Sequence, residues 1–219
     1  MSDRDVVIAR IFAAFGNNTH PGGGFLQGSF DGCELYEQVS PFATREDWKG
    51  IEVSFLDAHA DALNFFSEAG FRFFLPAYLI ADLRGDLSVA DPLFQLTHGF
   101  SDRTTEIPAN GRTFAMRYGK SAFINPRRYG ASTFYEYARY RLSIFTREEA
   151  SAIVAYLRFK RDLDPDVFDR EAIEAALDLF WLEREQSAPP ATSLEQHIAE
   201  QEEYLAAIRS GTEDGTGVR

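Results

Sequence analysis

The sequence is poor in cysteine, methionine and lysine, and it has no long apolar run. Among 219 residues there are one Cys, two Met and three Lys, against 19 Arg. A single cysteine excludes an intramolecular disulfide and a zinc site built from several thiolates. No stretch approaches the roughly 18 apolar residues of a membrane-spanning helix. The charged N-terminus, residues 1–5, leads into a helical pattern rather than an apolar signal core, so we expect a cytoplasmic protein without a membrane segment.

Positive charge is scarce overall, but it is concentrated in one segment. The chain has 22 basic and 34 acidic residues, a net charge of -12. Residues 103–141 contain eight basic and two acidic residues, a net of +6, whereas residues 162–203 contain thirteen acidic and two basic residues, a net of -11. The overall acidity disfavours general nucleic-acid binding, because phosphate is repelled by an acidic body. The separation of charge along the chain predicts surfaces of opposite sign.

Hydrophobic periodicity predicts a mainly α fold. We expect a single compact helical domain over residues 1–186, with an irregular central insert at about 86–130. The Pro-containing segment 187–192 is typical of a linker, residues 193–211 predict an appended polar C-terminal helix, and 212–219 predict a frayed tail. Whether the last helix docks on its own domain is left open, because its apolar stripe is narrow.

Two helices are predicted in the first third of the chain. One begins at a cap on Asp3 and ends at Gly16. The second begins at Thr44, where Thr44 and Asp47 form a variant of the capping box, and its pattern breaks at Gly70. The segment between these helices contains a glycine triplet and predicts a loop.

The densest apolar stretch, residues 71–83, predicts a central buried helix. It is apolar nearly all round, which is typical of a helix without a solvent-facing side. Pro76 is expected to start or kink this helix, and Gly85 to end it. The expected core comprises Ile11, Phe15, Trp48, Phe55, Phe66, Phe73, Phe74, Leu75, Leu79, Ile153, Leu157, Leu177 and Trp181.

The second half of the chain begins irregularly and then returns to helix. Residues 113–118 and 121–124 predict a short β-hairpin inside the insert. Helical periodicity returns at 132–141, and Thr146 with Glu149 forms a capping box that predicts the start of a strong helix. A further helix, capped near Asp169 or at Asp164-Pro165, is expected to bury Ile173, Ala176, Leu177, Phe180 and Trp181.

An aromatic pair followed by Leu-Pro-Ala-Tyr-Leu, at residues 73–79, resembles a family of small uncharacterised bacterial proteins of unknown function. A helix around Trp48 and the Thr146 capping box leading to Ala155-Tyr156-Leu157 are similar as well. The resemblance covers about Val6 to Glu185 and leaves out the last helix. It implies a compact, mostly helical protein and brings no catalytic residues.

Two places in the sequence contain residue types that can carry chemistry. Asp57, His59 and Asp61 are the most metal-like group, but on a helix His59 points about 160° away from the two acids. A solvated acidic face therefore explains them better. Cys33 has acidic neighbours, which would raise a thiol pKa, so we expect a small buried hydrophobe rather than a nucleophile. We predict no catalytic residue, metal or cofactor.

The basic segment is the candidate binding region. Arginine suits bidentate contact with phosphate or carboxylate, and five tyrosines interleave with the basic residues. Four interpretations stay open: contact with the chain's own acidic helices, an acidic protein partner, nucleic acid, or a small enzyme that holds an anionic substrate. A non-enzymatic protein-binding module is the function we expect first. The candidate anion- or partner-binding residues are Arg117, Lys120, Arg127, Arg128, Arg139 and Arg141.

Overall fold

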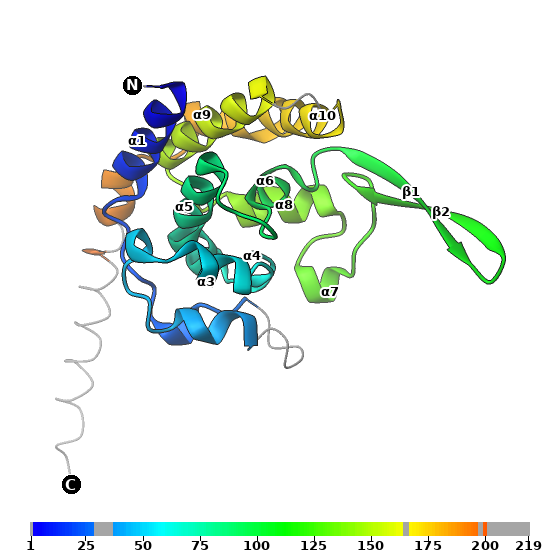
Figure 1. Cartoon of the computed structure of the whole chain (residues 1–219), viewed down its shortest axis with the longest axis horizontal. Helices are drawn as coiled ribbons and strands as arrows, with labels where there is room; N and C mark the ends of the chain where they lie inside the picture. Colours follow the sequence, from blue (N-terminus) through cyan, green and yellow to red (C-terminus); the bar gives the residue numbers. More distant parts are fainter. Residues whose placement is uncertain (1, 29–36, 164–166, 197–198, 201–219) are drawn as a thin grey trace, which may run out of the picture.

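Helices make up most of the chain, and the described residues contain a single two-stranded sheet. The computed structural model describes residues 2–28, 37–163, 167–196 and 199–200. The predicted mainly α fold is thereby confirmed (Figure 1). The α-helices are α1 (Asp3–Phe15), α3 (Val53–Ala58), α4 (Ala62–Phe65), α5 (Glu68–Arg84), α6 (Pro92–Thr97), α7 (Pro126–Tyr129), α8 (Phe134–Leu142), α9 (Arg147–Leu163), α10 (Val167–Ala176) and α11 (Leu182–Ser187).

Helix α5 is the predicted central helix, and it is buried along nearly its whole length. Its N-terminus is capped by the Ser67 hydroxyl, which accepts a hydrogen bond from the Gly70 N–H at 3.0 Å. It ends at Gly85, whose φ of 76° is left-handed, as the sequence predicts. Pro76 lies inside the helix and not at its start. Gly70 lies in the first turn, where a Cβ would stand 2.9 Å from the Leu26 carbonyl oxygen.

The helix predicted from Thr44 is wrong in its extent. Asp47 caps only a 3-10 turn, Trp48–Gly50, and the chain becomes extended at Ile51 before α3 begins at Val53. The Trp48 indole N–H donates to the Phe15 carbonyl at 3.3 Å. This tertiary bond fixes the tryptophan at the end of α1, so the segment turns there instead of continuing as one helix.

The predicted core is buried, with Phe55 only half-buried at its edge. Phe74 is completely buried and contacts Phe42, Phe66 and Phe73, with ring centroids 4.8 to 5.1 Å apart. Rings at these separations, mostly edge to face, gain energy beyond the area that they bury. Helix α1 packs against both α5 and α9, and α11 packs against α9.

A buried carboxylate ties three distant segments together. Glu149, in the first turn of α9, accepts hydrogen bonds from the Thr146 N–H at 2.9 Å and from the Asn18 amide at 2.7 Å. Arg72 of α5 donates to both of its oxygens at 2.9 and 3.0 Å. The side chain of Glu149 is 1% exposed and that of Arg72 is 20% exposed. The predicted capping box is thus present and also forms an ion pair between α5 and α9.

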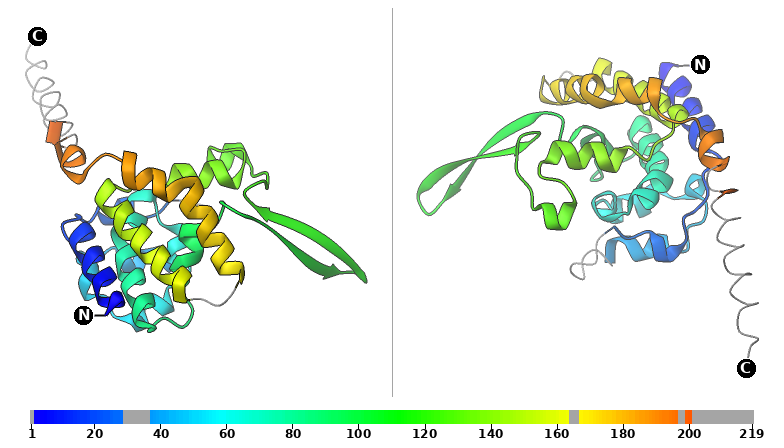
Figure 2. Two further views of the ribbon diagram at one scale, coloured as in Figure 1. Left: turned by 90° about the horizontal axis from the view of Figure 1, so that it is seen from above. Right: turned by 180° about the vertical axis from the view of Figure 1, so that it is seen from behind.

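The hairpin predicted at 113–118 and 121–124 is wrong in register. The strands are β1 (Asp102–Ala109) and β2 (Arg112–Gly119), paired antiparallel from Asp102↔Gly119 to Ala109↔Arg112. Asn110 and Gly111 form the turn with φ of 53° and 73°, values that Asn-Gly turns favour. The ribbon projects away from the helical body (Figures 1 and 2), and we call it the arm.

The chain after α9 forms one long helical run. Helix α10 passes through a π-helical segment, Leu177–Trp181, into α11, and the Leu182 N–H bonds the Leu177 carbonyl five residues back. Helix resumes at 191–196, and the remainder of the predicted C-terminal helix and tail lies largely outside the described residues. Within the described part of the chain, no helix is long and apolar enough to cross a membrane.

Candidate functional site

The two faces of the arm differ in character. Ile107 and Phe114 lie directly opposite each other on one face, and they are 41% and 53% exposed. The opposite face carries Thr104, Glu106, Thr113 and Ala115. The arm therefore presents an exposed apolar pair, Ile107 and Phe114, that no part of the described chain covers.

The root of the arm is fixed to the helical body by hydrogen bonds. The Lys120 N–H donates to the Ser101 carbonyl at 3.0 Å, and the Ser121 N–H and hydroxyl both donate to the Asp102 carboxylate. Gly119, with φ of 108°, passes so close to the Ser101 carbonyl that a Cβ would overlap it. These contacts define the direction in which the arm leaves the body.

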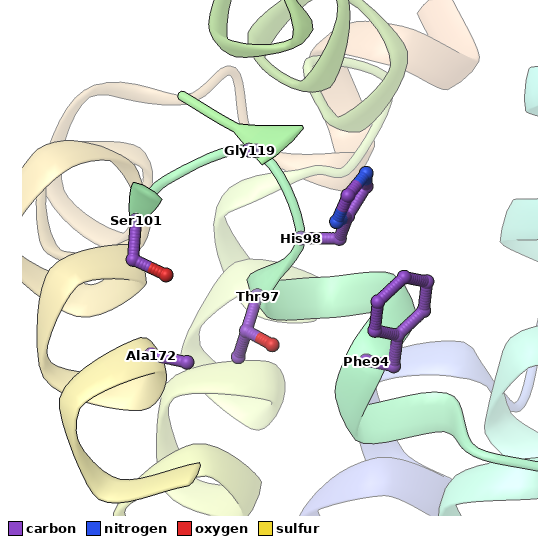
Figure 3. A pocket seen from close by; sticks show the side chains of 7 residues that line it. Phe94, Thr97, His98, Ser101, Gly119 and Ala172 are labelled. Atoms are coloured by element: carbon purple, nitrogen blue, oxygen red, sulfur yellow. The ribbon is translucent and has the colours of Figure 1, made fainter. Parts of the chain in front are cut away.

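A small cavity lies beside this root (Figure 3). Phe94 stacks on His98 at 4.6 Å, and Ala172 of α10 closes the far side. The space open to the centre of a water molecule is about 10 Å³, which is room for about one water. The cavity is therefore a packing gap between the arm and α10 rather than a substrate site. Its lining is Phe94, Thr97, His98, Gly99, Ser101, Gly119 and Ala172.

The loop after the arm folds back and is closed at both ends. The Ile124 N–H donates to the Ser132 carbonyl at 3.1 Å, and Phe123 forms an isolated antiparallel β-bridge with Thr133. Asn125 caps the short helix α7. Phe123 is 88% exposed, so the loop adds a third exposed apolar side chain to Ile107 and Phe114 of the arm.

The six predicted basic residues fall into two groups. The first group lies on the arm or its loop: the backbone places Arg117 in β2 and Arg128 in α7, and the side chain of Arg127 is exposed. Lys120, which follows β2, lies over the Tyr135 ring at 5.1 Å. The second group, Arg139 and Arg141, belongs to α8 and serves the helical body.

Arg139 is bound by groups from two helices. Its guanidinium donates to the Leu179 carbonyl at 2.9 Å, inside the π-helical segment, and to the Tyr135 hydroxyl at 3.1 Å. It also pairs with the exposed Glu183 at 3.4 Å. The hydrogen bond with Tyr135 raises the pKa of Arg139, although partial burial acts in the opposite direction. This residue therefore joins α8 to the acidic α10–α11 region of its own chain.

Arg141 is held deeper in the body. It lies over the Phe71 ring at 4.4 Å and donates to the Leu63 carbonyl and to the Gln95 side chain. Burial lowers the pKa of the Arg141 guanidinium from its ordinary value. Its contacts join α4, α5, α6 and α8, so its guanidinium has little room for an external anion.

Basic residues outnumber acidic ones on the arm and the loop that follows it, whereas the rest of the chain has an excess of acid. Residues 102–130 contain six basic and two acidic residues, a net of +4, which leaves -16 for the rest of the chain. Five of these eight residues lie on the two strands, Lys120 follows β2, and Arg127 and Arg128 lie on α7 in the loop that folds back. Opposite charges on separate surfaces attract a complementary partner and orient it.

In the acidic cluster near His59, the Asp57 carboxylate stabilises the backbone of residues 88–90. The Asp57 carboxylate accepts hydrogen bonds from the N–H groups of Ser88, Val89 and Ala90 at 3.0 to 3.3 Å. Burial raises the pKa of Asp57, but the three hydrogen bonds together outweigh it and lower the pKa. No group of three metal-binding side chains occurs among the described residues, and Cys33 lies outside them.

One surface feature was not predicted from the sequence. An open groove of about 500 Å³ runs between α1 and α9. Its floor is apolar, with Val6, Val7 and Phe159, and charged residues stand at its rim. The sequence does indicate such a groove, because each helix has a half-buried apolar residue beside its buried stripe, Val6 in α1 and Phe159 in α9. Its lining is Asp3, Val6, Val7, Arg10, Ala155, Arg158, Phe159, Asp162 and Leu163.

Comparison with known proteins gives no relative. The chain matches no protein-family model, no curated protein and no solved structure. The resemblance to an uncharacterised bacterial family therefore stays a prediction, and function is argued from the arm itself.

Proposed function

We propose that this protein is a non-enzymatic interaction module that binds an acidic protein surface through its arm. The observation that carries the proposal is the solvent-exposed Ile107–Phe114 pair on a projecting ribbon. Exposed apolar patches bordered by polar residues are typical of interaction sites. The arm offers such a patch at a distance from the body, where a partner meets little steric obstruction.

The charge of the arm together with the loop that follows it defines the chemistry of the partner. Arg112 and Arg127 are exposed, and the unit 102–130 carries a net +4. An acidic protein surface with an apolar centre complements this arrangement, because charge steers the approach and apolar area supplies the affinity. Nucleic acid would meet the same basic residues, so a test of the proposal has to distinguish a protein adduct from a nucleic-acid adduct.

A photo-crosslinking amino acid tests this proposal. It is placed at position 114, on the apolar face, and in a matched variant at the neighbouring position 113, on the opposite face. After illumination in the native host, we expect a discrete protein adduct from position 114 and an adduct at least about tenfold weaker from position 113.

Charge reversal is the second part of the experiment. Arg112→Glu combined with Arg127→Glu is expected to reduce the adduct from position 114, since both side chains are exposed. A nuclease digest separates protein adducts from nucleic acid. A nucleic-acid adduct, or equal adducts from the two faces, would refute the proposal.

A further inference from the structure

The arm has a complementary surface within its own sequence. Residues 162–203 carry a net -11, and the described part of this segment forms α10, the π-helical segment and α11. Glu171, Glu174 and Asp178 are exposed there, at spacings of three and four residues that align them along one side of the helix. Each chain therefore has an arm with an exposed apolar pair and an exposed arginine, Arg112, at its tip, and an acidic helical surface.

The arm does not fold back along this surface of its own chain. Only its root lies beside α10, where Ala172 shares the small cavity with Ser101 and Gly119, and the tip extends into solvent (Figures 2 and 3). A second copy of the chain has the same acidic surface beside the same root.

We propose that the partner of the arm is a second copy of this chain, an inference that rests on the proposed function. The two arms cross antiparallel about a two-fold axis, with their apolar faces together, and the tip of each arm reaches α10 of the other copy. A two-fold arrangement satisfies both arms with one self-complementary interface and leaves none free to extend the assembly.

The length of the arm fits this arrangement. Eight residues per strand span about 26 Å at roughly 3.3 Å per residue. An axis through the Thr105–Met116 pair, midway along β1, brings residue 109 and its pairing partner Arg112 level with Ser101 of the other copy. Since Ser101 and Ala172 line one cavity, Arg112 arrives near Glu171, which follows Arg170 and precedes Ala172.

The arms alone are too small to hold a dimer. One face of a ribbon about 26 Å long and about 10 Å wide covers roughly 250 Å², so two arms bury about 500 Å². Stable interfaces bury about 1,200 Å² or more. The contact between each arm and the acidic surface of α10 must supply the remainder, so charge reversal at that contact is a sensitive test of the assembly.

Sedimentation velocity on the full chain tests the dimer. We expect a species of twice the chain mass of 24.7 kDa at about 100 µM, where a dimer with a Kd of about 10 µM is mostly assembled. Phe114→Ser, Arg112→Glu and Glu171→Arg are each expected to weaken dimerisation at least about tenfold. Arg4→Glu makes the same charge change at an exposed position of α1, away from the arm, and should leave the dimer intact.

Mixing two charge variants gives the decisive result. In an equal mixture of the Arg112→Glu and Glu171→Arg chains, one arm contact is wild type and the other has both charges exchanged. The mixture is therefore expected to dimerise where each variant alone does not. Because residues 112, 114 and 171 are exposed, each variant is expected to fold like the wild type. Far-UV circular dichroism and the melting temperature check this.

The outcomes separate the two proposals. A monomer at every concentration, or a dimer that the variants do not weaken and the mixture does not restore, would overturn the second-copy proposal. If position 114 then crosslinks to a different acidic protein, the proposed function stands without it. If position 114 gives no protein adduct at all, both proposals fail. A dimer that disappears on nuclease treatment also overturns both.

Discussion

Replacing Glu149 by alanine should be among the most destabilising changes in this protein. The substitution removes the acceptor of the Thr146 N–H, of the Asn18 amide and of the Arg72 guanidinium. Breaking a buried ion pair by removing one partner costs about 3–5 kcal/mol, and losing a helix cap costs about 1 kcal/mol. Because Arg72 is 20% exposed, water recovers part of its hydration, so we expect a loss of about 3 kcal/mol.

Urea denaturation followed by tryptophan fluorescence measures this loss. With a slope of about 2 kcal/mol per molar urea, the midpoint should fall by about 1.5 M without a change in slope. Glu174→Ala is the matched control, since Glu174 is 48% exposed and pairs with Arg170 at 3.3 Å. A surface pair of this kind contributes less than about 1 kcal/mol.

A second variant separates the charge from the geometry at this position. Glu149→Gln keeps an oxygen that can accept from the Thr146 N–H, but it removes the ion pair with Arg72. It should therefore cost less than Glu149→Ala and more than the Glu174 control. A loss below about 1 kcal/mol for Glu149→Ala would refute the argument that this carboxylate joins α5 to α9.

Three further predictions test the other structural assignments. Phe74→Ala should cost about 3–5 kcal/mol in a urea melt, because the ring is fully buried among other aromatic rings, and a cost below about 1 kcal/mol would contradict the core assignment. Arg141→Ala should lower the free energy of unfolding by at least about 2 kcal/mol, since it leaves the Leu63 carbonyl without its donor. Arg127→Ala, at an exposed position, should change it by less than about 0.5 kcal/mol. Equal effects of the two substitutions would contradict the division of the basic residues into two groups. The lowered pKa of Asp57 means that its stabilising contribution is present above the unfolded value of about 3.9 and is lost as pH falls below it. The stability difference between wild type and Asp57→Ala should therefore narrow between pH 7 and pH 3, and a constant difference would count against the role of the carboxylate.

The helices that could be predicted are those whose ends are determined locally. The capping box at Thr146 and Glu149 and the left-handed Gly85 depend on residues within one turn, so the sequence alone identifies them. The helix predicted from Thr44 was wrong because Asp47, and not Thr44, is the capping residue, and it begins only a 3-10 turn. The indole bond from Trp48 to the Phe15 carbonyl joins residues 33 positions apart, and no local pattern shows it.

The arm could have been found from the sequence. Asn110-Gly111 is among the strongest short hairpin signals, and a turn at that dipeptide pairs the apolar residues 107 and 114 on one face. The hairpin predicted around Gly119 instead placed the turn where the chain re-enters the body. The strand register, and with it the exposed Ile107–Phe114 pair, follows once the correct turn is used.

The two groups of basic residues could not be separated from the sequence, since the contacts that engage the second group span long distances along the chain. Arg139 reaches Leu179, and Arg141 reaches Leu63, which lie 40 and 78 residues away. The Leu179 carbonyl lies in a π-helical segment, a local irregularity that periodicity does not reveal.

The separation of these groups changes the meaning of the charge asymmetry. Contact with the chain's own acidic helices was one of the interpretations left open, and the ion pair between Arg139 and Glu183 is such a contact. For the arm, the same interpretation would require β1 and β2 to lie along α10, whereas only their root does so. The net positive segment, residues 102–130, therefore includes the projecting ribbon with its exposed apolar pair. A surface of that kind gains most from a partner outside its own chain, because only association can both cover the apolar face and neutralise the excess charge.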